Sequence, residues 1–354
     1  MRRCRRLVLL VSILAAVPGA APAWAAAGRA EALRDLAPTG DAVVHDRVLL
    51  RPVAAAAVSF RRYGTGRTGE GVRVAVSRRY GRSAGVARSY ARFLGSLPHG
   101  AELSRLRVYI APRAEVRERC GGWAAVVACY SPSAGVIVVP GQRRLPGGLT
   151  TSYIVAHEYG HHIAANRSNS PFPTVAYGPK YWASNRLVCR LARTGGVAPG
   201  NEGGAYAANP AEAWAETYAW LRYPRVRWPF TRLLAPTPSA LAAARRDVLS
   251  PWTRGRTVTY AGVLGPGRAA RSFPVRLTLD GSARIALRGP RGADFDLRLS
   301  SGGRTLTATR TPGSADRIAP PGAVCRDAPA EWVTVTVQRR SGAGRFALTV
   351  AYPG

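Results

Sequence analysis

The chain of 354 residues is poor in acidic residues, and lysine is almost absent. It has 19 aspartates and glutamates against 51 lysines and arginines, a formal net charge of +32, and Lys180 is its single lysine. This charge would draw the protein to anionic polymers, such as those of a cell wall, or to membrane surfaces, although a plain bias of composition would produce the same charge. The arginines are spread along the chain and no nucleic-acid-binding motif occurs, so no nucleic acid partner is expected.

Residues 1–25 have the features of a secretory signal peptide. A basic start, MRRCRR, precedes an apolar run over residues 7–17 and the small-residue cleavage site AWA. The run is too short for a membrane-spanning helix, so we expect cleavage after Ala25, with Ala27 as the alternative. This predicts a secreted or extracellular protein, exported by the ordinary route or, as the paired arginines in RRLVL would allow, by the twin-arginine route.

Cysteine is scarce, and removal of the signal peptide would leave Cys120, Cys129, Cys189 and Cys325. No C-x-x-C spacing occurs, which argues against a zinc site built from cysteines. An even number in an exported chain predicts two disulfides. Pairing Cys120 with Cys129 would close a short loop, and Cys189 with Cys325 would then join two domains. Buried free thiols are the alternative.

Hydropathy patterns divide the rest of the chain into two domains and predict an α+β domain followed by a small all-β sandwich. Residues 26–68 are weakly patterned, and we interpret them as an N-terminal segment or pro-segment. Residues 69–235 alternate strand and helix patterns, and the proline-interrupted residues 236–255 form the linker. Residues 256–354 hold short alternating runs separated by Gly, Ser and Pro, typical of an antiparallel β-sandwich.

Within the first domain, strands are expected at 72–77 and 106–112, with a helix over 83–97 between them and Ser83 as its cap. The segments 123–130 and 135–141 are expected to form a hairpin. A helix over 152–167 follows, with Thr150 or Thr151 as its cap, and a further helix starts from the cap Asn209 and Pro210.

The helix over 152–167, SYIVAHEYGHHIAANR, holds three of the five histidines of the chain. His157 and His161 are one helical turn apart on the same face, so both imidazoles can bind one metal ion. Glu158 lies beside them, where its carboxylate can reach a water on that metal. This is the H-E-x-x-H pattern of zinc peptidases, and Gly160 permits close packing over the site. An inert, polar helix is the alternative.

A catalytic zinc site needs a third protein ligand. His162 is the last histidine of the chain, a histidine at the metzincin spacing is replaced by Arg167, and no aspartate occurs between His162 and Asp247. The acids in this range are Glu202, Glu212 and Glu216. Glu202 lies on a glycine-rich loop that would hold it poorly. The other two are one turn apart on one helix face, where Glu212 has a capping box with Asn209 as its alternative role.

These two motifs, HEYGH and, some fifty residues later, NPAEAWAE, resemble those of the gluzincin metallopeptidases, in the lethal-factor-like subgroup with E-x-x-A-E on the second helix. The resemblance implies a zincin-like catalytic domain with Glu212 as the zinc ligand and Glu216 as its support. It also implies a tyrosine that stabilises the oxyanion; the nearest match is Tyr206, for which a packing or lid role is the alternative. The hairpin ending in GVIVVPG fits the strand that pairs with substrate, and the C-terminal region resembles pre-peptidase C-terminal domains.

The sequence therefore predicts a secreted zinc metalloendopeptidase that acts on a protein or peptide substrate. Zn²⁺ held by His157, His161 and Glu212 would activate a water, and Glu158 would be the general base. Two alternatives stay open. One is a non-catalytic protein that binds a cell surface or wall polymer and carries a vestigial zinc site. The other is a zinc hydrolase acting on a non-peptide amide.

Overall fold

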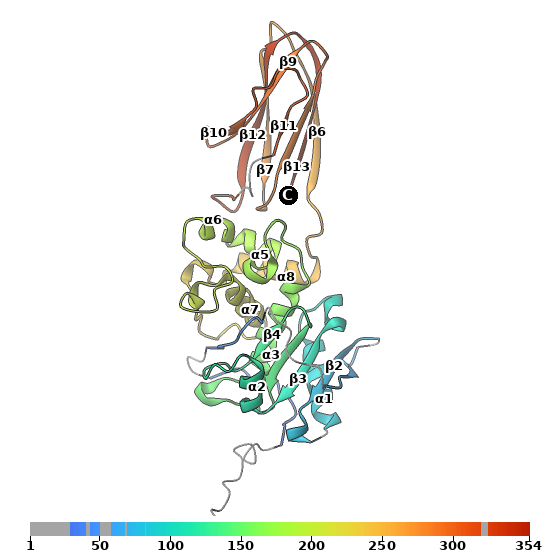
Figure 1. The fold of residues 1–354 in the computed structure, drawn as a ribbon, viewed down its shortest axis with the longest axis vertical. Helices are drawn as coiled ribbons and strands as arrows, with labels where there is room; N and C mark the ends of the chain where they lie inside the picture. The colour runs from blue at the N-terminus through green and yellow to red at the C-terminus, as the bar shows by residue number, and fades with distance from the viewer. Residues whose placement is uncertain (1–28, 40–42, 50–57, 68, 82, 320–324) are drawn as a thin grey trace, which may run out of the picture.

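The computed structural model describes residues 29–39, 43–49, 58–67, 69–81, 83–319 and 325–354. The predicted signal peptide lies outside the described residues. An α+β unit and an all-β unit are stacked along the long axis of the molecule (Figure 1). The predicted α+β class with a separate β-sandwich is thus confirmed. No helix in the described ranges is long and apolar enough to cross a membrane.

The α+β unit is built on one mixed, five-stranded sheet. Its order is β1 (Arg61–Gly64), β2 (Gly71–Val76), β3 (Arg107–Ala111), β5 (Val136–Pro140) and β4 (Cys129–Ser131). The three central strands are parallel and the two outer strands are antiparallel to their neighbours. β5 reads VIVVP and is buried throughout, as expected for a strand with both faces covered. The first hairpin strand is shorter than predicted because residues 121–125 form turns.

Helices cover both faces of this sheet. α1 (Ala84–Ser96) and α3 (Thr151–Ala165) pack on one face, and α2 (Arg113–Arg119) packs on the other. The caps are those that the sequence predicts: Ser83 accepts from the backbone of Val86, and Thr150 accepts from that of Tyr153. The other helical elements before the sandwich are α4 (Thr174–Tyr177), α5 (Lys180–Asn185), α6 (Val188–Arg193), α7 (Pro210–Trp220), α8 (Pro238–Leu249) and the short 3₁₀ turns Arg78–Tyr80, Ala101–Arg105, Pro146–Gly148, Tyr206–Ala208 and Arg232–Leu234.

α3 and α7 pack together at one very small residue. A Cβ atom placed on Gly160 would lie 2.8 Å from the Cα of Ala215 and 3.2 Å from the Cβ of Tyr218. The indole of Trp214 donates a hydrogen bond of 2.7 Å to the carbonyl of Gly160. Any side chain at this position would therefore push the two helices apart, which agrees with the close packing predicted for Gly160.

Two boundaries differ from those predicted. The linker range 236–255 contains α8, whose Ala240, Ala244 and Val248 belong to the core of the α+β unit. The prolines that suggested a linker include Pro238, which suits the first turn of a helix. At the other end, β1 is already part of the sheet, and residues 29–39 lie against the domain. There Asp35 accepts a hydrogen bond of 2.6 Å from the hydroxyl of Tyr223.

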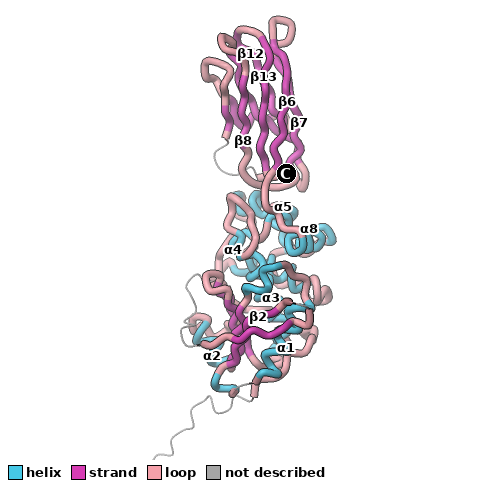
Figure 2. The backbone as a smooth tube through the Cα atoms, turned by 90° about the vertical axis from the view of Figure 1, so that its right-hand side faces the viewer, coloured by secondary structure: helices cyan, strands magenta, loops and turns pink. Residues whose placement is uncertain are grey.

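The all-β unit is a sandwich of two four-stranded sheets, visible edge-on in Figure 2. Its core is formed by alternate residues of both sheets, among them Phe295, Val335 and Leu348. One sheet has the order β10 (Arg304–Ala308), β9 (Asp294–Ser301), β12 (Glu331–Ser341) and β7 (Ala270–Leu277). The other has the order β11 (Arg317–Ile318), β8 (Arg284–Arg288), β13 (Gly344–Tyr352) and β6 (Arg256–Leu264).

Both predicted disulfides, Cys120–Cys129 and Cys189–Cys325, are present. The first closes the loop before β4. The second joins α6 to the sandwich, so the two units are covalently linked at a second point besides the chain itself. Next to it the buried Arg326 donates to Asp280 at 3.2 Å and to the backbone carbonyl of Ser184 at 2.6 Å.

We expect Gly160→Ala to lower the thermal unfolding temperature and Gly85→Ala to raise it. Overpacking against the backbone of α7 costs roughly 1–3 kcal/mol, more than the roughly 0.5–1 kcal/mol that alanine gains over glycine within a helix. Gly85 lies on α1 with no atom near its added Cβ, so only the gain applies there. The measurement is calorimetry of both variants, and equal upward shifts would contradict the close approach of α3 and α7.

Candidate metal centre

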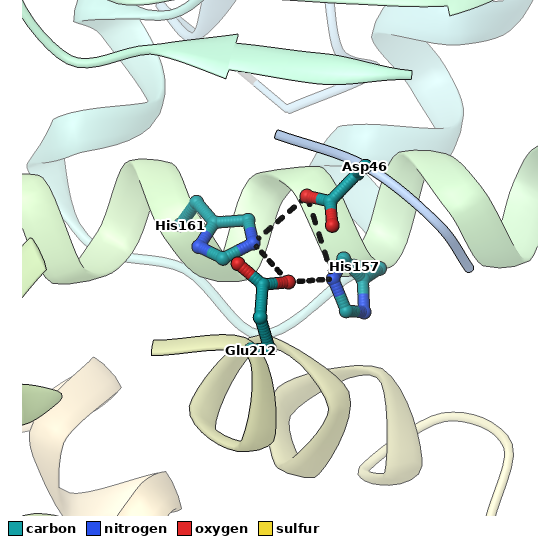
Figure 3. A group of neighbouring side chains, drawn as sticks. All are labelled: Asp46, His157, His161 and Glu212. Carbon is teal, nitrogen blue, oxygen red and sulfur yellow. Dashed lines mark hydrogen bonds and ion pairs between the residues drawn. The ribbon is translucent and has the colours of Figure 1, made fainter. Parts of the chain in front are cut away.

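Four buried side chains converge where α3 meets α7. His157 and His161 come from α3, Glu212 comes from α7, and Asp46 comes from an extended N-terminal segment that crosses above the helix (Figure 3). One ligand atom from each residue lies within 4.8 Å of all the others. The structure thus brings together the three predicted metal ligands and adds Asp46, which the sequence analysis missed.

The distances between these atoms suit a small tetrahedral metal ion. Glu212 Oε2 lies 3.3 Å from the Nε2 atoms of both His157 and His161. Asp46 Oδ2 lies 3.1 Å from His161 Nε2 and 3.7 Å from His157 Nε2. A tetrahedral zinc with bonds of about 2.0–2.1 Å separates its ligand atoms by about 3.3–3.4 Å. The four groups are therefore spaced as ligands of one ion.

Several buried polar atoms in this cluster have no hydrogen-bond partner among the described residues. They are Asp46 Oδ2, both carboxylate oxygens of Glu158, His161 Nε2 and Glu212 Oε1. A buried polar group without a partner is costly, and a buried charge without a counter-charge more so. A cation would remove most of this cost, so the residues fit a metal ion.

The electrostatics of the cluster point the same way. Burial lowers the pKa of His157, but the surrounding carboxylates more than reverse this and raise it to about 10. Burial, followed by the charge of Asp46, raises the pKa of Glu158 well above its ordinary value. Burial also acts to raise the pKa of Glu212, yet His161 and His157 hold it well below its usual range. The carboxylates are thus competing for positive charge.

Glu216 supports the site from behind, as the sequence predicts. Its Oε2 lies 3.0 Å from Nδ1 of His157, the ring nitrogen that faces away from the other ligands. Its Oε1 accepts a hydrogen bond from the hydroxyl of Tyr153. A carboxylate on the far nitrogen of a ligand histidine fixes the ring orientation and raises its basicity.

Tyr206 lies at the edge of the cluster. Its hydroxyl is 3.0 Å from Glu212 Oε2, 2.6 Å from Asp46 Oδ1 and 3.0 Å from the carbonyl of Val44. A phenol has one proton to donate, so these three acceptors compete for it. The ring also lies 5.8 Å from that of Phe230, so both the predicted oxyanion role and the packing role have residues to support them.

Three other acidic or imidazole groups lie elsewhere. Glu202 accepts from the side chain of Asn209 at 3.4 Å and is not part of the ligand cluster. Asn209 alone caps α7, through the backbone of Ala211, while the carboxylate of Glu212 faces the histidines, so the capping-box alternative is wrong. His162 lies against the carbonyl of Glu102 at 2.9 Å, and burial lowers its pKa to about 4.

Asp46 escaped the sequence analysis because the search for a third acid ran only downstream of the histidine helix. The available signal was weak: an acid between apolar residues in VVHDRVLL, a segment without helical or clear strand periodicity. Its two neighbours in the pattern, Val44 and Val48, alternate with exposed positions, as in an extended strand.

Comparison with known proteins adds little to this picture. No family model matches the chain, and no curated protein matches it. Among solved structures, the chain is similar to the pre-peptidase C-terminal domain of collagenase from Bacillus anthracis, at 15% identity and a TM-score of 0.21. That match covers 27% of this chain and 88% of the other. The description of the C-terminal unit as a β-sandwich therefore rests on its own strand pairing.

Metal titration of single variants will separate the roles of the two glutamates on α7. Glu212→Ala removes a ligand and should weaken zinc binding by orders of magnitude. Glu216→Ala should cost roughly 10- to 100-fold in zinc affinity, the usual effect of removing the partner of a ligand histidine. Glu118→Ala, at an exposed glutamate on α2, is the control. Loss of all zinc in Glu216→Ala beside normal binding in Glu212→Ala would reverse the assignment.

Proposed function

We propose that the protein is a secreted zinc metallopeptidase of the gluzincin type, with residues 61–249 as a zincin-like catalytic domain. The arrangement of a mixed sheet over the histidine helix, with a second helix bringing Glu212, supports this fold. Export is supported by the two disulfides.

The carboxylate of Glu158 is the observation that carries the proposal. It is completely buried next to a ligand histidine, and neither of its oxygens has a hydrogen-bond partner among the described residues. Such a carboxylate is a burden to a purely structural metal site, which has no use for a base. A hydrolase needs one there, held in a dry site with a raised pKa.

In the proposed reaction, His157, His161 and Glu212 hold the metal and Glu216 orients His157. Bound zinc would act as a Lewis acid and lower the pKa of water toward about 7. Glu158 accepts a proton from the attacking water as the new C–O bond forms, and later delivers it to the amine as the C–N bond breaks. Tyr206 is placed to donate its proton to the carbonyl oxygen as charge develops there. One water is consumed, and an acid and an amine are released.

The donor set also suits a second metal, which the experiment has to distinguish. Two histidines and a carboxylate bind zinc, but the same set binds non-haem iron(II). Metal analysis of protein purified without chelators therefore comes before any assay. The proposal expects zinc near one equivalent.

The proposed partners are a protein or peptide substrate and, through the basic charge, an anionic wall polymer or membrane surface. No nucleic acid partner is proposed. A non-catalytic surface-binding protein with a structural zinc stays as the second candidate, and one observation favours it: four protein side chains surround the site, as in a closed structural centre.

We expect Glu158→Gln to retain zinc and to lose about 100- to 10,000-fold in peptide hydrolysis, the usual contribution of a general base. The variant is made in the wild-type chain and in an Asp46→Ala background, because Asp46 shares the ligand cluster. The measurements are zinc content by mass spectrometry and cleavage of a mixed peptide library.

Glu118→Gln is the matched control, since it removes one exposed carboxylate from the same domain and should change neither quantity. The peptidase proposal fails when neither the wild-type chain nor the Asp46→Ala chain cleaves any peptide, or when Glu158→Gln cleaves as fast as its parent.

A further inference from the structure

The candidate catalytic groups are sealed from solvent. The exposed fraction is 0% for His157, Glu158 and Glu212 and 3% for His161. A peptidase has to admit a peptide to these groups, and its metal has to keep one position open for water. The structure therefore represents a closed form, and the question is which part of the chain closes it.

Residues 43–49 close the site by adding to the edge of the sheet. The backbone of Val127 donates to the carbonyl of His45 at 2.8 Å, and that of Tyr130 donates to Arg47 at 3.0 Å. Leu49 donates to the carbonyl of Tyr130 at 2.7 Å. β4, which contains Tyr130, is the edge strand, since β5 is already paired on both sides. The segment binds as an extended peptide adds to a sheet, parallel to β4.

Within this segment the side chains alternate between two environments. Val44 and Asp46 are buried, each with 1% exposed. His45 and Arg47 face the other way: the His45 ring packs edge-on at 5.9 Å from that of Trp123, and the guanidinium of Arg47 lies 5.7 Å over the same ring. The strand geometry therefore directs the Asp46 carboxylate at the metal ligands (Figure 3).

Asp46 occupies two of the functions that the proposed reaction needs. Its Oδ2, 3.1 Å from His161 Nε2, takes a ligand position in the cluster. Its Oδ1 accepts at 2.6 Å from the hydroxyl of Tyr206, the candidate oxyanion donor. With Asp46 in place, the metal has four protein ligands and the phenol is occupied.

We infer that residues 43–49 are an inhibitory strand, and that Asp46 masks the metal by filling the position meant for water and substrate. The inference rests on the proposed function, and it concerns the regulation of that same site. The protein is latent in this form. Activity requires the strand to leave β4, whose edge then becomes free to pair with a substrate.

The test uses cobalt(II)-loaded full-length protein and acetohydroxamate, a small chelating probe of an open metal position. Asp46→Ala should keep the metal on its three remaining ligands. Its affinity for the probe should exceed that of the wild type by at least about 10-fold, the change expected when the strand leaves the metal free about a tenth of the time or less. The visible spectrum of the cobalt reports binding directly, independently of any peptidase activity.

Asp46→Asn keeps the shape of the side chain and is the second variant, in case alanine disturbs folding; it should also gain affinity for the probe. Asp35→Asn is the matched control, because its carboxylate belongs to the same N-terminal segment and contacts Tyr223 instead of the metal cluster. It should behave as the wild type.

Loss of cobalt in Asp46→Ala and Asp46→Asn would overturn the inference and make Asp46 a permanent ligand of a structural site. Equal affinity for acetohydroxamate in wild type and both variants would also overturn it. Unmasking of the metal without hydrolysis of any peptide would uphold the masking by Asp46 while contradicting the peptidase proposal.

Discussion

The arrangement of the α+β unit depends on a concentration of buried negative charge. Asp46, Glu158, Glu212 and Glu216 are each at most 1% exposed, and they surround the two imidazoles of His157 and His161. Carboxylates this close and this dry repel one another unless positive charge is shared among them. Protonated histidines supply part of it, and a divalent metal would supply more while satisfying the partnerless oxygens.

The fold supplies the precision that such a cluster needs. α3 lies on the sheet, so its histidines are held by a packed core, and Gly160 lets α7 approach until the Cα of Ala215 would touch any added Cβ. That approach places Glu212 in front of His157 and Glu216 behind it. Small residues at one helix crossing thus set the distances between charged groups on either side of it.

Much of this was predictable because it depends on local patterns. The histidine helix, the caps Thr150 and Asn209, and the alternating strands all follow from neighbours in the sequence. The pairing of the cysteines followed from their number and spacing. Asp46 was not predictable in the same way, since its contacts come from chain segments far away in the sequence. The helical linker was missed because prolines both start helices and interrupt them.

A metal with four protein ligands is usually described as structural, and one with three as catalytic. That distinction assumes that every ligand is held equally firmly. Here His157, His161 and Glu212 belong to two helices packed in the core, whereas Asp46 belongs to a strand attached at the edge of a sheet by a few backbone hydrogen bonds. The four ligands therefore differ in how much structure must be lost to release each one, and Asp46 is the one that the fold can give up without dismantling the helices.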